Sequence, residues 1–498
     1  MVYGITKFQS PLNRKLNLNQ ITMKNNRREF LKRTGLAGIG LVSVGMIRSF
    51  GADTKKKQAD KTAKSRKQLF NMCGYAAPKI DTVRVGFIGL GSRGPGHVMN
   101  MSLLEGVEIK GLCDLLPEEV EKVRKRIEYT GFKPVLYSGD ENSWKKLCEN
   151  PDIDMVYICT PWNMHAAMAV YAMEHGKHVA IEVPAANTLE ECWQLVETSE
   201  KTRKHCMMVE NCCYDFFELL TLNMSRQGLF GEIIHGEGAY IHDLLKSNFT
   251  KEGGYWNMWR LRENAERQGN LYPTHGLGPI CQIMDINRGD KMDFLVSVMS
   301  RDFLMNETAK ELSAKDDFFK EFVNKPYRGN MTTTTILTNK GRSIMVQHDV
   351  TSPNPYSRIH KVSGTKGSAL KYPEPAKIAF GDRWVNAEEM KELEEKYSPA
   401  IVKKVGVLAK QVGGHGGMDF LMDWRLIDCL RNGLPLDQDC YDAALWSSIA
   451  PLSEKSVANR STSVDVPDFT GGSWKTNKAV DILLEQGGTT RAIRTRPK

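Results

Sequence analysis

A mostly apolar segment that ends in a glycine-rich turn constrains the fold of this chain more than any other feature. Residues 82–90, TVRVGFIGL, are typical of a buried strand. Gly89, Gly91 and Gly94 follow with GxGxxG spacing, and a helical pattern begins at about Pro95. Gly89 permits a tight turn, and Gly91 lets the backbone approach a pyrophosphate at the helix N-terminus. The acid Asp114 ends the next predicted strand, so the context predicts a dinucleotide-binding domain.

The acid at the end of the second predicted strand indicates which dinucleotide binds. The Asp114 carboxylate can accept hydrogen bonds from a ribose diol and would repel a 2′-phosphate, so we expect NAD. Arg93, inside the turn, keeps NADP open, because an arginine there could contact a phosphate.

Strand and helix patterns alternate through the first half of the chain. After 82–90, strands are expected at 107–113, 155–160 and 178–183, and helices at 95–104, 117–129, 163–175 and 188–203. This alternation predicts a doubly wound parallel sheet, the Rossmann architecture, over residues 81–213.

The pattern changes after residue 213. Longer alternating strands are expected at 233–241, 294–300, 332–338 and 342–350, and fewer helices separate them. They predict a second, substrate-binding α+β domain with a mostly antiparallel open sheet and a C-terminal tail, spanning 214–498. We expect a flexible glycine loop at 413–417, before a helix at 418–431.

The first 52 residues predict an export signal. Arg27 and Arg28 precede Phe-Leu-Lys and a mild apolar run at 35–47, which resembles a twin-arginine leader. The run is too short and glycine-rich for a membrane span, and no cysteine ends it, so no stable membrane anchor is expected. A basic linker at 53–80 follows. We expect the twin-arginine export machinery as a partner and a periplasmic or secreted location, with translation starting at Met1 or Met23.

Charge and cysteine content exclude two classes of function. Much of the net charge of +9 lies in the leader and linker, without a nucleic-acid-binding motif, so no nucleic acid is expected. The eleven cysteines contain no CxxC pair and lie mostly in apolar runs. We expect buried thiols and no metal site, although the adjacent Cys212 and Cys213 could be redox-active.

Two further motifs each follow a predicted strand. They are TPWNMH at 160–165 and EVPAA at 182–186, and with the glycine fingerprint they resemble the glucose–fructose oxidoreductase and inositol dehydrogenase superfamily. In those dehydrogenases the second motif reads Glu-Lys-Pro, and its lysine transfers the proton at the substrate carbinol. Val183 replaces that lysine, and Gly278 stands where a histidine of their Asp-x-Gly-x-His element is expected. Both departures suggest redox chemistry that serves another reaction.

Four motifs narrow the resemblance. EVPAA at 182–186, MVEN at 208–211, LYPTHG at 271–276 and GHGGMD at 414–419 resemble glycoside hydrolase family 109, NAD-dependent α-N-acetylgalactosaminidases, over about residues 80–475. The resemblance implies sugar contacts at Tyr240, Arg260, Tyr272 and Tyr356. It implies NAD contacts at Ser92, Arg93, Asp114, Trp162, Asn163, Met164, His165, Glu182, Val183 and Asn211. His165 is equally well explained as a structural histidine at a helix start.

The resemblance also implies a reaction. Oxidation of the sugar at C3 acidifies the C2 proton, the C1 leaving group departs by elimination, water adds, and C3 is reduced again; such glycosidases are exceptions to the two-carboxylate mechanism. Tyr272 and His275 are the leading catalytic candidates, with Tyr214 in reserve. Which one deprotonates C3 or C2, and which sugar and linkage are cleaved, stay open. An exported sugar oxidoreductase with tightly bound NAD and a non-catalytic sugar-binding protein are the alternatives, and a homo-oligomer is left open.

Overall fold

The computed structural model describes residues 67–495, so the predicted leader and the first half of the linker lie outside the described residues. The first domain is a six-stranded parallel sheet of order β3-β2-β1-β4-β5-β6. Its strands are β1 (Val83–Ile88), β2 (Val107–Cys113), β3 (Val135–Tyr137), β4 (Met155–Ile158), β5 (His178–Ile181) and β6 (Cys206–Met208). Its helices are α3 (Gly94–Ser102), α4 (Pro117–Arg126), α5 (Ser143–Glu149), α6 (Trp162–Glu174) and α7 (Leu189–Thr202).

The strand order places the ligand crevice. Strands β1 and β4 are neighbours, and the sheet winds outward in opposite directions from them. Ligands of such sheets bind beyond the carboxyl ends of the strands at this switch point. The GxGxxG turn follows β1 and the TPWNMH motif follows β4, so the topology brings both motifs to one edge.

The second sheet has nine strands in the order β14-β13-β12-β11-β7-β10-β9-β8-β15. Only the β10–β7 pair is parallel among the described neighbours. The strands are β7 (Ile233–Ile241), β8 (Met292–Met299), β9 (Thr332–Thr338), β10 (Ser343–Asp349), β11 (Lys361–Gly364), β12 (Gly367–Leu370), β13 (Lys377–Phe380), β14 (Arg383–Trp384) and β15 (Val464–Asp465). The predicted fold class, a Rossmann sheet with a second, mostly antiparallel sheet, is confirmed.

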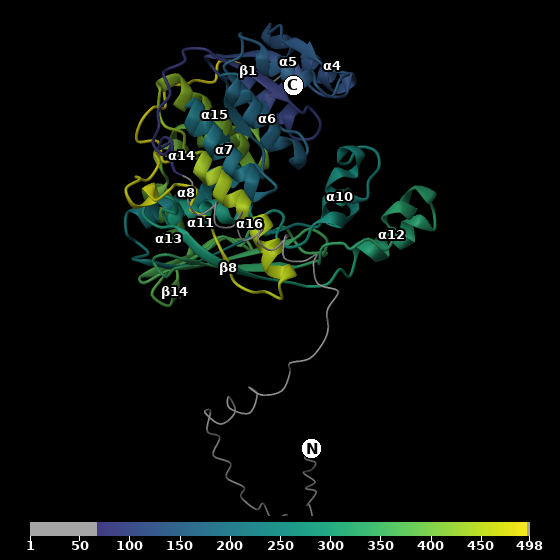
Figure 1. Ribbon diagram of the computed structural model, residues 1–498. Helices are drawn as coiled ribbons and strands as arrows, with labels where there is room; N and C mark the ends of the chain where they lie inside the picture. Colours follow the sequence, from purple (N-terminus) through teal and green to yellow (C-terminus); the bar gives the residue numbers. More distant parts are fainter. Residues whose placement is uncertain (1–66, 496–498) are drawn as a thin grey trace, which may run out of the picture. The chain divides into compact units, whose positions relative to one another are not determined.

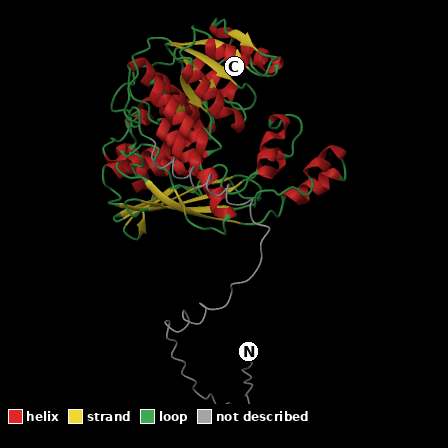
Figure 2. Ribbon diagram, in the orientation of Figure 1, coloured by secondary structure: helices red, strands yellow, loops and turns green. Residues whose placement is uncertain are grey.

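Helices lie between the two sheets (Figures 1 and 2). Helix α11 (Thr274–Ile283) packs on β7, and α16 (Cys440–Ala458) contacts both β8 of the second sheet and α7 of the first domain. Helix α15 (Met418–Asn432) packs against α3 of the first domain. The C-terminal helices therefore bind the two sheets together. The other helices are α8 (Phe216–Arg226), α9 (Leu245–Asn248), α10 (Trp259–Glu266), α12 (Met305–Ser313), α13 (Ala387–Tyr397) and α14 (Ala400–Val412).

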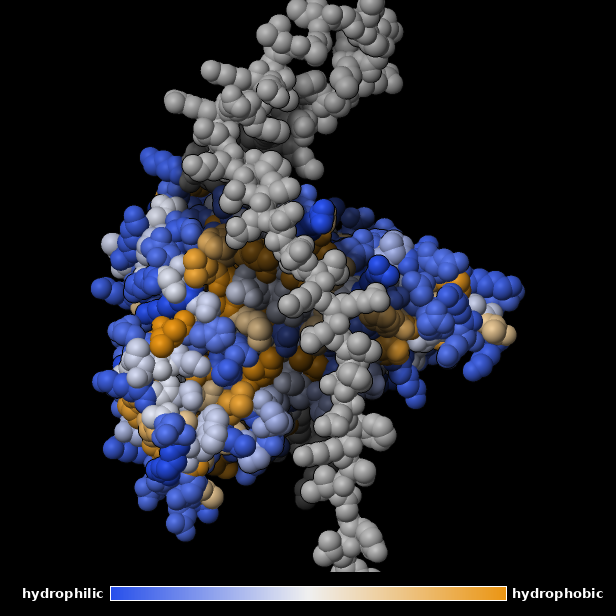
Figure 3. Space-filling model, turned by 90° about the horizontal axis from the view of Figure 1, so that it is seen from below, coloured by the Kyte–Doolittle hydropathy of each residue, from blue (hydrophilic) through white to orange (hydrophobic). Residues whose placement is uncertain are grey.

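The far face of the nine-stranded sheet carries hydrophobic and hydrophilic side chains side by side (Figure 3). Alternation along β8 and β10 directs Val296, Val298 and Met345 to this face, and Val298 is 60% exposed. A small separate core that includes Phe249, Phe319 and Phe322 joins α10 and α12 beside the sheet. In the described part of the chain, no helix is long and apolar enough to cross a membrane.

Candidate active site

The glycine turn after β1 has the shape that a dinucleotide needs. Gly89 has φ +89°, and a Cβ there would lie 2.6 Å from the Cys159 backbone. A Cβ at Gly94 would lie 2.0 Å from the Gly89 carbonyl oxygen, so the helix starts close to the strand. At Gly91 a Cβ would meet no atom within 4 Å, and no side chain caps the first turn of α3. The turn therefore leaves space and free N–H groups for a pyrophosphate.

The predicted ribose acid holds the turn in place. The Asp114 carboxylate accepts hydrogen bonds from the Leu90 N–H at 2.6 Å and the Leu116 N–H at 3.0 Å. Its side chain is half-buried at the end of β2, so part of it still faces the crevice. Ser92 and Asn163 are exposed at the same edge, and Met164 is half-buried.

Behind the turn, a group of five charged side chains ties the first domain to α15. We call Arg93, His97, Glu182, Asp419 and Asp423 the clasp. Arg93 donates to Glu182 at 3.0 Å and to Asp419 at 3.1 Å. His97 lies 3.0 Å from Glu182 and 2.8 Å from Asp423. The Arg93 charge is thus satisfied within the protein, which leaves little reason for it to select a 2′-phosphate.

Within the clasp, His97 is a buried cation. Burial lowers the pKa of its imidazole, but the ion pairs with Asp423 and Glu182 outweigh this effect and raise the pKa to about 10. The Tyr157 hydroxyl also donates to Asp423 at 3.0 Å. Asn211 reaches the clasp from beyond β6, where its amide donates to Asp419 at 2.6 Å.

The loops after β4 and β5 are joined by a histidine. The two ring nitrogens of His165 each lie 2.7 Å from a backbone carbonyl oxygen, one of Thr160 and one of Pro184. The ring is buried, which matches the structural interpretation of this histidine. Val183 is also buried beside the Glu182 carboxylate, so no proton-transferring side chain stands at the dehydrogenase lysine position.

Two glycines bring α11 onto β7. A Cβ at Gly276 would lie 2.2 Å from the Ala239 nitrogen, and one at Gly238 would lie 2.1 Å from the Gly276 carbonyl oxygen. The helix and strand backbones therefore touch. This contact places the Tyr272 ring 4.7 Å and the His275 ring 5.2 Å from the Tyr240 ring, measured between centroids.

Tyr272 also connects the rings of Tyr240 and His275 to the edge of the first sheet where the cofactor is expected to bind. Its ring stacks on Trp162, the first residue of α6, with centroids 5.5 Å apart. Arg260 lies over both rings, 4.9 Å from the Tyr272 centroid and 5.1 Å from the Trp162 centroid. One Arg260 nitrogen donates to the Tyr255 hydroxyl at 2.7 Å, and another is buried without a hydrogen-bond partner. A buried guanidinium N–H without a partner is suited to bind a ligand oxygen.

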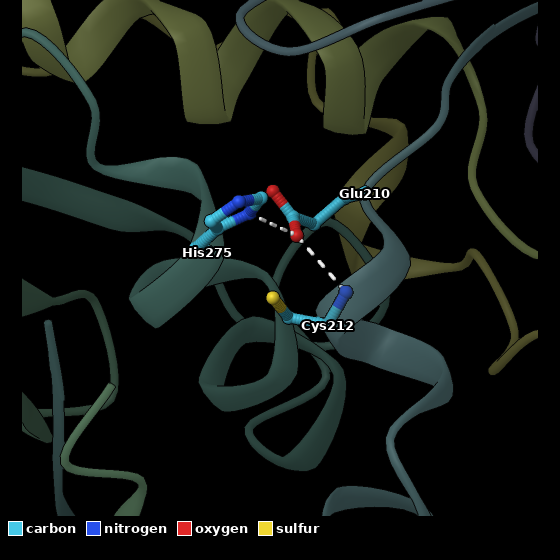
Figure 4. A group of neighbouring side chains, drawn as sticks. All are labelled: Glu210, Cys212 and His275. Carbon is cyan, nitrogen blue, oxygen red and sulfur yellow. Dashed lines mark hydrogen bonds and ion pairs between the residues drawn. The ribbon is translucent and has the colours of Figure 1, made fainter. Parts of the chain in front are cut away.

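His275 is paired with a buried carboxylate (Figure 4). Its Nδ1 lies 2.7 Å from Oε1 of Glu210, which also accepts the Cys212 N–H at 3.0 Å. Burial raises the pKa of the Glu210 carboxyl, but the electrostatic attraction and hydrogen bond of His275 outweigh this effect and hold the pKa below its usual value. Glu210 is thus ionised. The ligand-type atoms of Glu210, Cys212 and His275 lie within 4.8 Å of one another, a spacing that could hold a metal ion.

Two predicted site residues lie away from this centre. The Tyr214 hydroxyl donates to Asp437 at 3.0 Å, and its side chain is fully buried, so the structure places it in the core. Tyr356 contacts Tyr240 and His242, with its ring 6.3 Å from Tyr240 and 5.0 Å from His242. It is 36% exposed, which suits the outer part of a sugar site.

Glu210, His97, Asp419 and Asp423 were not predicted as site residues. Three of them had a usable signal: His97 follows Arg93 by four residues, and Asp423 follows Asp419 by four, so each pair shares a helix face. Glu210 stands in the MVEN motif, but nothing local indicates its partner 65 residues away.

Comparison with known proteins identifies two family models along the chain. Residues 83–210 match "Oxidoreductase family, NAD-binding Rossmann fold". Residues 214–476 match "Glycosyl hydrolase 109, C-terminal domain". Together the matched residues include the glycine turn and the aromatic residues Trp162, Tyr240 and Tyr272.

Relatives and solved structures agree with these models. A protein of Bacteroides fragilis named α-N-acetylgalactosaminidase is 51% identical over 410 residues, which are 81% of this chain and 96% of that protein. Glycosyl hydrolase family 109 protein 1 of Bacteroides thetaiotaomicron is 48% identical over 462 residues, 88% of this chain and 96% of the relative. Levoglucosan dehydrogenase, in complex with NADH and levoglucosan, shares the fold with a TM-score of 0.58 at 20% identity, covering 78% of this chain and all of the other.

Proposed function

The chain belongs to glycosyl hydrolase family 109 and is an NAD-dependent glycoside hydrolase, and we propose that it releases terminal α-linked N-acetylgalactosamine from oligosaccharides or other glycosides. The observation that supports this most is the pairing of His275 with Glu210 beside Tyr272, at a nicotinamide crevice in which Val183 replaces the dehydrogenase lysine. The site can move protons, but not from the position that a simple dehydrogenase uses.

Bound NAD supplies reversible oxidation and reduction at C3 of the sugar. The C3 ketone makes the C2 proton acidic, so a base can remove it as the C1–O bond breaks. Water then adds at C1, and a proton returns to C2. This sequence needs groups that hold and move protons near C2 and O3.

Tyr272 and His275 are the two groups that the geometry offers. Burial raises the pKa of the Tyr272 phenol well above its usual value, and the nearby Tyr240 adds to this effect. Tyr272 therefore keeps its proton at neutral pH and can donate it. His275 has one ring nitrogen engaged by Glu210, and its Nε2 has no protein partner among the described residues. His275 can therefore accept one of the two protons that leave the sugar, at O3 or at C2, and Tyr272 can take the other only by passing its own phenolic proton on. Both assignments fit the arrangement.

Arg260, Tyr240 and Tyr356 are proposed to bind the sugar. Arg260 offers its unpartnered N–H, and the rings of Tyr240 and Tyr356 lie 6.3 Å apart beside it and offer aromatic surface. Sugars bind well to aromatic faces with a few fixed polar groups.

We also propose that the protein is exported by the twin-arginine machinery to the periplasm or beyond. The motif at Arg27 and Arg28 supports this route, and a protein that folds around a cytoplasmic dinucleotide needs a route for folded cargo.

Hydrolysis of aryl glycosides by purified protein, with no NAD added, tests the proposed function. The aryl α-N-acetylgalactosaminide should be cleaved faster than the β-anomer and the α-glucoside. Hydride exchange between two free sugars without cleavage of any glycoside would instead favour the sugar oxidoreductase. Binding of the sugar without either reaction would favour the non-catalytic sugar-binding protein.

A further inference from the structure

Gly278 makes room for a carboxylate behind His275. It follows His275 by one turn of α11, on the same face. A Cβ at position 278 would lie 2.9 Å from Cγ of Glu210 and 3.0 Å from Sγ of Cys213. Both neighbours are buried, so neither can give way without disturbing the core. Glycine at this position therefore permits the Glu210 side chain to reach His275.

Glu210 itself is held from three directions. Its N–H donates to the side-chain oxygen of Gln438 at 3.3 Å, and its carbonyl accepts the Gln438 amide at 3.1 Å. Its Oε1 accepts the Cys212 N–H at 3.0 Å. The side chain has no exposed surface. The carboxylate is thus presented to His275 in one fixed place.

An ionised carboxylate can only accept a hydrogen bond, so Nδ1 of His275 must carry the proton in the 2.7 Å contact. The other nitrogen, Nε2, is then an acceptor in the neutral ring. The ring lies edge-on to Tyr272, with centroids 4.8 Å apart, and its side chain is 14% exposed. Nε2 is therefore the part of His275 that a ligand can reach.

We propose that Glu210 is a positioning residue that holds His275 in the Nδ1–H tautomer, and that Gly278 is required for this because any larger residue would displace Glu210. The proposal rests on the proposed function in one respect, namely that His275 takes a proton from the sugar. Without the carboxylate the ring would populate both tautomers and orientations, and the Nε2–H tautomer cannot act as a base at the site.

The first test is steady-state kinetics of Glu210→Gln, which keeps the shape and removes the charge. We expect kcat to fall by about 10²–10⁴-fold, the range for losing an oriented acid–base group. KM and the amount of bound NAD should change little, because the Glu210 side chain has no exposed surface. The matched control is Glu200→Gln. Glu200 is also buried and accepts two hydrogen bonds, from the Leu69 N–H and the Tyr441 hydroxyl, in α7. An unchanged kcat in Glu210→Gln would overturn the proposal.

The second test needs no substrate. Nitrogen-15 NMR of histidine-labelled protein reports the tautomer of each ring, and the His275 signal is the one absent from His275→Asn. The wild type and Glu200→Gln should show His275 with the proton on Nδ1, and Glu210→Gln and Gly278→Ala should show a mixture. A wild-type signal with the proton on Nε2 would overturn the proposal, even if both site variants failed to fold.

The two tests separate this proposal from the proposed function. A wild-type protein that cleaves no glycoside but shows the Glu210-dependent tautomer would refute the function and support the positioning role. Dialysis against EDTA tests whether Glu210, Cys212 and His275, whose spacing could hold a metal ion, bind one that the activity needs. Loss of activity on dialysis, with recovery on adding Zn²⁺, would assign the three residues to a metal and overturn the proposal.

Discussion

His275 and Asp114 are two side chains of the site for which we propose different roles, proton transfer and cofactor binding. Asp114 lies at the end of β2, where its carboxylate orders the glycine turn and faces the crevice. His275 lies across the site on α11, where Glu210 engages one nitrogen and leaves the other free. We therefore propose that Asp114 acts on the cofactor and His275 on proton transfer, so their substitutions should have separable effects.

Asp114→Ala should weaken NAD binding. A hydrogen bond from ribose to a charged carboxylate contributes about 1.5–3 kcal/mol, and the variant also loses the bond from the Leu90 N–H that holds the turn. The measurement is the amount of nucleotide released when the purified variant is denatured, compared with the wild type. Release of NADP from the wild type would contradict the assignment of Asp114.

His275→Ala should leave NAD bound and lower turnover by about 10²–10⁴-fold, because it removes an acid–base group. The measurement pairs initial rates on the aryl glycoside with the nucleotide content of the same preparation. Tyr214→Phe is the comparison, since Tyr214 lies in the core and its hydroxyl bonds Asp437. A greater loss of turnover in Tyr214→Phe than in His275→Ala would move the proton-transfer role to Tyr214.

At the scale of elements, the clasp joins α3 to α15 through side chains four residues apart on each helix. Arg93 and His97 come from α3 and its N-cap, and Asp419 and Asp423 come from α15. The N-terminal end of α15, which follows Gly417, therefore lies beside the glycine turn, because Arg93 belongs to that turn and pairs with Asp419. The free energy of unfolding of the protein should therefore depend on whether His97 is charged.

The pH dependence of unfolding tests that charge. His97 has a pKa of about 10 when folded and about 6.5 when unfolded, so its stabilisation is complete below about pH 6.5. It falls as pH rises toward 10 and is lost above that value. His97→Gln should cost about 3–5 kcal/mol at pH 6 and flatten the decline in the urea midpoint between pH 7 and 10. Parallel declines in variant and wild type would show that His97 is neutral.

The sequence predicted the long or strongly patterned elements well. The predicted strands at 107–113, 233–241 and 332–338 have the bounds of β2, β7 and β9, because apolar alternation marks their ends. Helix α16 was missed because it is buried on nearly all sides and shows no helical period. The short strands β3 and β6 were missed because three residues carry no pattern.

The site was predictable only where motifs are local. Tyr272 and His275 share one motif, and the structure brings both to Tyr240 through the Gly276 contact, which no sequence pattern shows. Glu210 and the acids of the clasp act across 65 or more residues, so only the fold reveals their partners.

At the scale of the whole molecule, we propose that the binding of NAD by the folded protein and its export after folding depend on each other. A protein that binds NAD tightly can work where free NAD is scarce, provided that it is exported after folding. The leader at residues 1–52 lies outside the described residues, so the route is tested in cells.

Replacement of Arg27 and Arg28 by lysine should retain the precursor inside the cell, because the twin-arginine machinery reads this pair. Immunoblots of periplasmic and cytoplasmic fractions measure the distribution. A conservative change in the linker, Lys56→Arg, serves as the matched control. Normal export of the double variant would refute the twin-arginine interpretation.

Deuterium at C2 of the released sugar distinguishes elimination from direct displacement. Elimination and re-addition break and remake the C2–H bond, whereas direct displacement at C1 never breaks it. The purified enzyme hydrolyses the aryl glycoside in D₂O, and mass spectrometry and proton NMR locate the label. We expect one deuterium at C2 in the product, and hydrolysis that leaves C2 fully protiated would contradict the elimination mechanism.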